Sequence, residues 1–171
     1  MDSRLILQNI LRFLLLVLFQ ALILNNVHMG GFVVPFIYIL FIAMLPVGMN
    51  RVGLLFLAFV TGLIMDVFCN MPGFHAFACT LIAFCRITFA DRILTRNEAV
   101  EIPTPSIHSV KPQYFIGYLI VLTAIFYTAY FVLELFDSRS LGRLFIAIIL
   151  STIVSSALSL ICQLIFIKKK K

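Results

Sequence analysis

The chain has 171 residues, of which 63% are hydrophobic and 12% are charged, and its net charge is +6. So few charged residues cannot supply the polar surface of a water-soluble domain, and the apolar content excludes intrinsic disorder. Four cysteines without a regular spacing exclude a disulfide scaffold. The class that remains is an integral membrane protein in which residues 1–171 form a single domain.

Six long apolar stretches predict six transmembrane helices, because about 20 apolar residues are needed to cross the hydrocarbon core of a bilayer. In chain order they cover residues 5–24, 32–49, 52–69, 74–90, 114–136 and 144–167. The first stretch is not followed by a small-residue cleavage site, so we expect a retained helix rather than a signal peptide. The predicted fold class is an all-α polytopic membrane protein.

Most connections between these stretches are short, which predicts antiparallel helix hairpins. One connection, residues 91–113, is longer and contains Pro103, Pro105 and Pro112, which disfavour a continuous helix. We expect its first part to extend the fourth helix and its second part to be extended. It is the only soluble segment large enough to dock a partner by itself.

Basic residues are distributed unevenly between the two sides of the predicted bundle. Arg139 and Arg143 fall on one side, and the other eleven of the 13 Lys and Arg residues fall on the opposite side. The positive-inside rule then places both termini and the loop 91–113 in the cytoplasm. The net charge therefore indicates attraction to anionic lipid headgroups rather than to nucleic acid. The final run 168–171 is interpreted as a solvated tail at the headgroups.

Four charged residues fall inside the predicted helices and need an explanation, because charge is costly within a bilayer. Arg12 and Arg86 lie near the cytoplasmic ends of their helices, where we expect their side chains to snorkel to the headgroups. Glu134 lies beside the charged turn that follows the fifth helix, so a local ion-pair cluster explains it. Asp66 is the residue that a helix end or a loop does not readily explain.

Asp66 lies in the third predicted helix, with Gly62 four residues earlier on the same face. A small residue at that position lets another helix approach closely. Asn70, Pro72 and Gly73 predict a tight turn into the fourth helix. The Asp66 carboxylate could then accept hydrogen bonds from backbone N–H groups at the start of that helix, or from the imidazole of His75. We expect Asp66 to be a structural staple, that is, a side chain that links the third and fourth helices of this hairpin. The alternative is that Asp66 forms a proton, ligand or partner site.

The remaining polar residues form no pattern typical of catalysis or metal binding. His28, His75 and His108 fall in separate parts of the chain, and the cysteines form no C-x-x-C pair, so we expect no metal site. The thiols are interpreted as small apolar side chains. Phosphate-binding loops, nucleophile elbows and zinc-protease motifs are lacking, so the sequence predicts no enzyme and no cofactor.

Two helices carry polar side chains at high density. The polar residues of the sixth helix indicate close helix packing. They are Ser151, Thr152, Ser155, Ser156 and Ser159. The tyrosines of the fifth helix are interpreted as core residues, and the alternative is an interface with another protein. They are Tyr114, Tyr118, Tyr127 and Tyr130.

The segment Gly62-Leu-Ile-Met-Asp66, followed by Pro72-Gly-Phe-His-Ala76-Phe-Ala, resembles a signature of the rod shape-determining MreD family. The hydropathy outline is similar along the whole chain, whereas the motif covers only residues 62–78. Residues that match the motif are Gly62, Asp66, Gly73, His75 and Ala76. The chain departs from the family in Asn70 and Pro72 of the turn and in the proline-rich loop 91–113.

This resemblance implies a non-enzymatic inner-membrane scaffold subunit of the bacterial cell-elongation machinery, which controls cell shape and peptidoglycan synthesis. It also implies an MreC-like single-span protein as a partner and, more widely, MreB, RodA and a penicillin-binding transpeptidase. The chain more distantly resembles the substrate-binding S-components of energy-coupling-factor vitamin transporters, which share a six-helix outline. That alternative needs an outward-opening solute pocket and small residues on the face that grips the transporter module, and the first helix has no small-x-x-x-small pattern. A small membrane enzyme is a third alternative, without a supporting motif.

Overall fold

The computed structural model describes residues 3–26, 33–89, 104–107, 109–134 and 141–166. The described chain is helical, as the sequence predicts. Its elements are α1 (Ser3–Leu22), the 3-10 helix η1 (Leu24–Asn26), α2 (Ile39–Ala43), α3 (Arg51–Cys69), α4 (Phe74–Phe89), α5 (Pro112–Glu134) and α6 (Leu141–Phe166). Predictions for His28, His108 and Arg139, for most of the loop 91–113 and for the run 168–171 concern residues outside the described ranges.

Within the described ranges, three helices are long and apolar enough to cross a membrane, namely α3, α5 and the part of α6 at Leu144–Ile165. Apolar segments of α1 and α4, Ile6–Leu22 and Phe74–Phe89, are shorter. Five of the six predicted helices are therefore present, with ends within a few residues of those expected. The α5 helix begins at Pro112, which the sequence placed in a loop, because proline is well suited to the first position of a helix.

The second predicted helix, 32–49, is wrong as a continuous helix. Only the five residues of α2 are helical, and residues 34–37 before them have no regular structure. Pro35 and Pro46 explain the difference, because proline lacks an N–H group and restrains the residue before it. Every residue from 35 to 45 is nevertheless buried, and we call this stretch the buried segment.

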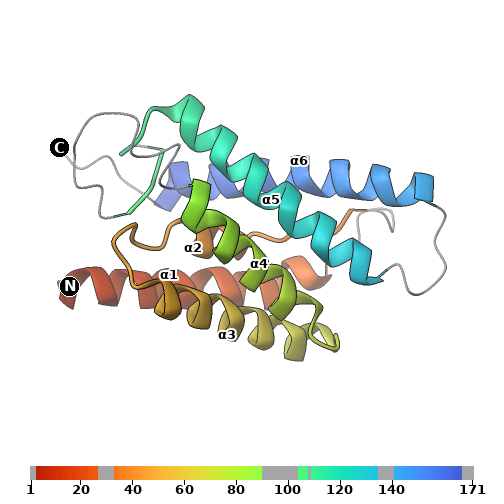
Figure 1. The fold of residues 1–171 in the computed structure, drawn as a ribbon, viewed down its shortest axis with the longest axis horizontal. Coiled ribbons are helices and arrows are strands. Elements are labelled where there is room, and N and C mark those ends of the chain that lie inside the picture. The colour runs from red at the N-terminus through yellow and green to blue at the C-terminus, as the bar shows by residue number, and fades with distance from the viewer. Residues whose placement is uncertain (1–2, 27–32, 90–103, 108, 135–140, 167–171) are drawn as a thin grey trace.

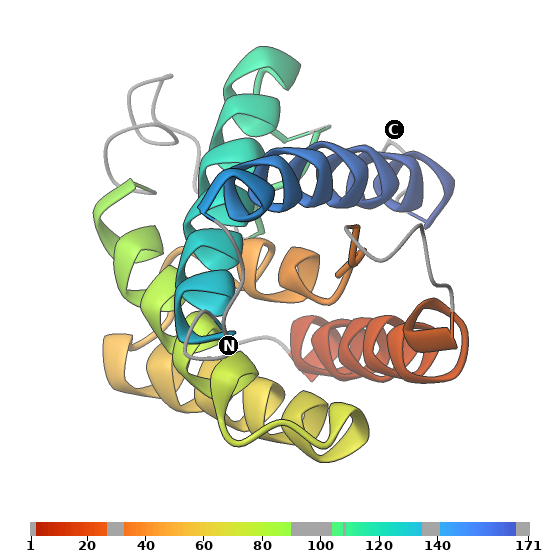
Figure 2. The ribbon, with the colours of Figure 1, turned by 90° about the vertical axis from the view of Figure 1, so that its right-hand side faces the viewer.

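The helices form an arc around the buried segment. Viewed along the bundle in Figure 2, α1, α3, α4, α5 and α6 follow one another around the arc, and α2 lies on its inner side. Figure 1 shows α3 and α4 as one antiparallel hairpin and α5 and α6 as another. The start of α1, the start of α3 and the end of α6 lie at the same end of the bundle (Figure 1).

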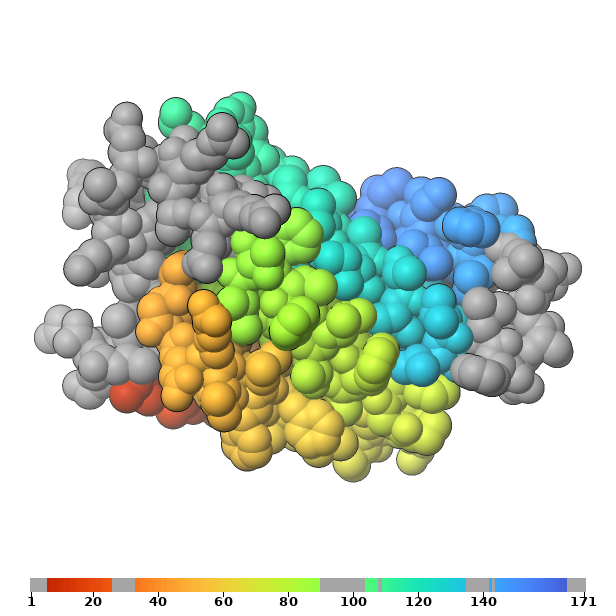
Figure 3. Space-filling view, in the orientation of Figure 1, coloured from red at the N-terminus to blue at the C-terminus, as the bar shows by residue number. Residues whose placement is uncertain are grey.

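The outer surface of the arc is apolar. Val67 is 77% exposed, Leu7 68% and Ile165 67%. In water such a surface would favour association, whereas it suits contact with lipid chains. The helices α4 and α5 lie side by side on one face (Figure 3) and form there a shallow apolar groove of about 470 Å³. Composition, helix lengths and this surface together are those of a membrane protein.

Candidate functional site

Asp66 staples the joint between α3 and α4, as the sequence predicts. Its two carboxylate oxygens accept hydrogen bonds from the backbone N–H groups of His75 and Ala76, each at 2.9 Å. These groups lie in the first turn of α4, where backbone N–H groups have no partner within the helix. A carboxylate at this position also interacts favourably with the helix dipole. Asp66 is only 5% exposed, so both hydrogen bonds are shielded from water.

Gly62 allows α4 to approach α3 closely enough for this staple. A Cβ atom at Gly62 would lie 2.4 Å from the Cα of Ala76 and 2.5 Å from the carbonyl oxygen of His75. Both contacts are with backbone atoms, so a side-chain rotation cannot relieve them. The two residues that Gly62 touches are the same two whose N–H groups bind Asp66.

The turn between the two helices depends on two residues with positive φ. Asn70 ends α3 in the left-handed conformation, with φ 53° and ψ 41°, and its N–H group donates to the carbonyl oxygen of Asp66. Met71 donates to the same carbonyl at 2.9 Å. Gly73 has φ 95°, a conformation that side chains disfavour, and its carbonyl accepts from the N–H group of Phe77. Asn70 and Gly73 therefore shape the turn that brings α4 back to Asp66.

The imidazole of His75 does not bind Asp66, which settles the alternative that the sequence left open. Its Nδ1 atom lies 2.6 Å from the hydroxyl of Tyr38, in the buried segment. Rings of Phe36 and Tyr130 lie 4.8 and 4.9 Å from the imidazole between ring centroids. His75 is fully buried, and its Nε2 atom has no hydrogen-bond partner. His75 therefore connects the joint to the buried segment.

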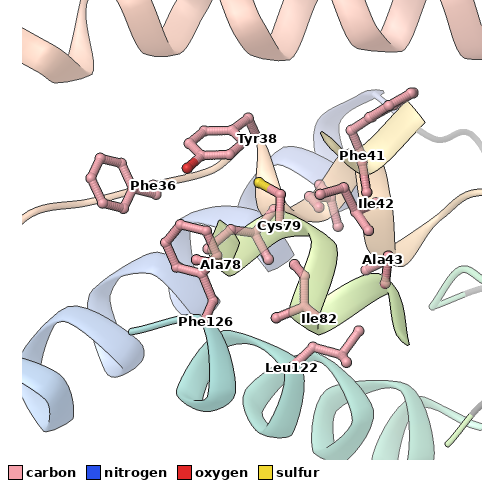
Figure 4. Close-up of a cluster of buried hydrophobic side chains, with 14 of the residues drawn as sticks. Phe36, Tyr38, Phe41, Ile42, Ala43, Ala78, Cys79, Ile82, Leu122 and Phe126 are labelled. Atoms are coloured by element: carbon pink, nitrogen blue, oxygen red, sulfur yellow. The ribbon is translucent and has the colours of Figure 1, made fainter. Parts of the chain in front are cut away.

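Packing of the buried segment against α4 and α5 is mainly apolar. Figure 4 shows Phe36, Tyr38 and Phe41 on one side of this contact, and Cys79 and Phe126 on the other. All four cysteines, Cys69, Cys79, Cys85 and Cys162, are free thiols. Cys79 is completely buried among these side chains, in agreement with its interpretation as a small apolar residue.

Polar side chains from the surrounding helices bind the non-helical backbone of the buried segment. Gln20 of α1 accepts from the N–H group of Ile37 at 2.9 Å and donates to the carbonyl of Pro35 at 2.9 Å. Gln20 is completely buried. Irregular backbone is tolerated at membrane depth only where protein groups or water satisfy its hydrogen bonds. Gln20 supplies that function from a helix that is otherwise mainly apolar.

The α5 and α6 helices provide further partners for the backbone at the start of the buried segment and for Val34 just before it. The N–H group of Phe36 donates to the hydroxyls of Tyr127 and Ser155, both at 3.0 Å. The hydroxyl of Tyr127 in turn donates to the carbonyl of Val34, whose N–H group donates to Ser151. Ser151 and Ser155 of α6 thus accept hydrogen bonds from the backbone of Val34 and Phe36.

Arg86 binds the end of α2, which corrects the expectation that its side chain snorkels to the headgroups. Its guanidinium donates to the carbonyls of Ala43 and Leu45 and to the hydroxyl of Tyr118. Tyr118 also donates to the carbonyl of Ala43 at 3.1 Å. Arg86 is only 2% exposed, so it points into the bundle. These carbonyls lie at the end of α2, where helical carbonyl groups lack partners within the helix.

The tyrosines of α5 are mainly core residues, as expected. Tyr118, Tyr127 and Tyr130 are at most 4% exposed, whereas Tyr114 is 40% exposed.

Sequence reasoning missed Gln20 as a site residue and misplaced Arg86. The sequence did contain a signal for the contact between Gln20 and the buried segment. Gln20 is a polar residue within an apolar helix, and Pro35 and Pro46 interrupt the stretch 32–49.

These residues form one connected structural unit, in which Asp66 holds α4, His75 contacts Tyr38, and four helices hold the buried segment. The sequence of the chain shows no match to a family model, to a curated protein or to a solved structure. The arrangement can position helix surfaces, because it fixes α1, α4, α5 and α6 relative to one another through the buried segment.

Proposed function

We propose that the chain is a non-enzymatic scaffold subunit of the bacterial cell-elongation machinery, similar to the MreD family, and spans the inner (cytoplasmic) membrane several times. The joint between α3 and α4 supports this best. Each residue that carries the resemblance lies in the joint: Gly62, Asp66, Gly73, His75 and Ala76. The shared motif therefore corresponds to a structural element rather than to scattered positions.

The mechanism proposed is lateral docking within the membrane. The joint and the buried segment hold the arc of helices in one arrangement, and its apolar outer faces are available to the membrane helix of a partner. An MreC-like single-span protein is the first candidate for that partner. MreB, RodA and a penicillin-binding transpeptidase would join through MreC or through the cytoplasmic loop. The scaffold would thereby place peptidoglycan synthesis and cell shape under common control.

The experiment is purification of a tagged chain from its native membranes in mild detergent, followed by mass spectrometry. We expect a single-span protein at a fixed molar ratio and loss of normal cell shape when the chain is depleted. Asp66→Ala should lower the amount of folded chain, because two buried N–H groups lose their acceptor, at a cost of about 2–4 kcal/mol. Partner recovery per mole of folded chain should then be unchanged. Normal shape after depletion, with no peptidoglycan-related partner recovered, would contradict the proposal.

One observation favours the second candidate, a substrate-binding subunit similar to the S-components of vitamin transporters. The buried Nε2 atom of His75 has no hydrogen-bond partner, which is unusual for a buried polar atom and could indicate a solute site. Native mass spectrometry of the same purified chain separates the two functions. A tightly bound vitamin would favour the transporter subunit, whereas a stoichiometric membrane protein would favour the scaffold.

A further inference from the structure

The α1 helix carries a cation that no acidic group in the described part of the chain neutralises. Arg12 is half-buried, and its Nη1 atom is enclosed without a hydrogen-bond partner. Within the described ranges the acidic residues are Asp66 and Glu134, near the ends of α3 and α5. Figure 1 places those helix ends at the opposite end of the bundle from the start of α1. Among the described residues, Arg12 is therefore a positive charge without an acidic partner, in an apolar helix.

A neighbouring donor lies on the same side of α1. Asn9 precedes Arg12 by three residues, and its Nδ2 atom is also enclosed without a partner. Arg12 lies nine residues after Ser3, about 13 Å along the helix axis. Arg86 makes an informative contrast, because that buried guanidinium binds two carbonyls and a hydroxyl of its own chain. Arg12 has no comparable set of acceptors among the described residues.

Three exposed residues of α1, together with the half-buried Arg12, have the spacing of a helix-pairing surface. Gln8, Arg12, Leu15 and Phe19 follow one another at intervals of four, three and four residues, and we call them the Arg12 stripe. This is the spacing of the contact positions between two paired helices. Leu15 is 50% and Phe19 43% exposed, and Gln8 is exposed as well. The α1 helix lies at one edge of the arc in Figure 2.

We propose that the Arg12 stripe docks a single membrane-spanning helix of a partner protein, and that an Asp or Glu in the cytoplasmic half of that helix pairs with Arg12. A carboxylate matches the guanidinium in charge and accepts two parallel hydrogen bonds from it. Pairing is the usual arrangement for ionisable residues within a membrane. Leu15 and Phe19 extend the contact into the apolar half, where a lipid phosphate has nothing to bind. This inference rests on the proposed scaffold function.

The groove between α4 and α5 is a useful comparison, because nothing in it selects a charged partner. It is lined mainly by apolar side chains, including Phe77 and Ala124. The hydroxyl of its Thr128 donates to the carbonyl of Ala124 within the same helix, at 2.8 Å. A substitution in this groove therefore tests whether any change on the lipid-facing surface disturbs docking.

The experiment compares partner recovery by variants of the tagged chain in nanodiscs, with and without the anionic lipid phosphatidylglycerol. Arg12→Gln should lower the recovery of the single-span partner about tenfold in both lipids, which corresponds to 1.4 kcal/mol. Phe19→Ala should lower recovery as well, although it leaves the charge in place. The matched controls are Arg51→Gln, which removes an exposed arginine at the same end of the bundle, and Thr128→Leu in the groove. Both should stay within twofold of the unaltered chain.

A charge exchange makes the test specific to the pair. Arg12→Glu should abolish recovery, and replacement of the partner's carboxylate residue by Lys should restore it. Circular dichroism before each measurement confirms that the variant is folded. Equal recovery by the unaltered chain and by folded Arg12→Gln would overturn this inference and leave the scaffold function intact. Dependence on Arg12 only when phosphatidylglycerol is present would assign the site to a lipid phosphate instead, and recovery of no single-span protein by the unaltered chain would overturn both.

Discussion

At the scale of single residues, Gly62 and Asp66 act together. The missing side chain at Gly62 brings the backbone of His75 and Ala76 against α3, and Asp66, one turn later, binds the N–H groups of the same two residues. Close approach of the helices is therefore a condition for the staple. Either residue alone would be unremarkable in an apolar helix, and the spacing of four residues between them makes the joint possible.

Gly62→Ala should destabilise the chain by about 3 kcal/mol, because the added Cβ atom meets backbone and forces α3 and α4 apart. Gly117→Ala is the matched control. Gly117 lies in α5 with nothing within 4 Å of an added Cβ, so alanine there should stabilise the helix by up to about 1 kcal/mol. The chain has no tryptophan, so unfolding in sodium dodecyl sulfate is best followed by circular dichroism. Equal stability of the two variants would rule out the close approach.

At the scale of elements, the buried segment depends on side chains that other helices supply. Gln20→Leu should lower the free energy of unfolding by about 2–4 kcal/mol, because the N–H group of Ile37 and the carbonyl of Pro35 lose their partner inside the bundle. Gln113→Leu is the matched control, because Gln113 is exposed at the start of α5. Its effect should be within about 0.5 kcal/mol. The same detergent titration measures both, and similar values for the two variants would show that Gln20 does not hold the segment.

This element also shows how far the sequence could predict the fold. Hydropathy alone is sufficient for α1, α3, α4, α5 and α6, because each is a nearly continuous apolar run of helical length. It fails for residues 32–49, because an apolar average does not register what Pro35 and Pro46 do to the backbone. The compensating hydrogen bonds were also invisible, since Arg86 and Leu45 are 41 residues apart in the chain.

The candidate site shows the same division between local and distant contacts. The Asp66 staple could be predicted because its partners follow within 10 residues and a turn joins them. The contact between His75 and Tyr38 could not, because it spans 37 residues and depends on a segment that hydropathy assigns to a helix. Local spacing therefore indicates the joint, whereas only the folded chain reveals what the joint holds.

At the scale of the whole molecule, the return of the chain through the buried segment determines at which end of the bundle every later helix starts. Figure 1 shows that α1 and α3 start at the same end of the bundle, so the chain between them returns across its full depth although little of it is helical. If residues 32–49 did not return to the end of the bundle where α1 starts, each later helix would be inverted within the bundle. The count of basic residues then predicts a definite orientation, with the end that carries Arg51 and Lys111 in the cytoplasm.

Cysteine labelling measures this orientation directly. In a chain whose four natural cysteines are replaced, Pro72→Cys in the turn between α3 and α4 should react with a membrane-impermeant maleimide on intact spheroplasts. Lys111→Cys, just before α5, should react only after lysis. Pro72 and Lys111 are both exposed, so a difference in labelling reports the side of the membrane rather than burial in the bundle. Labelling of both variants after lysis is the control for reactivity. The reverse pattern on intact spheroplasts would mean that the charge asymmetry does not set the orientation, and it would place the start of α1 outside the cell.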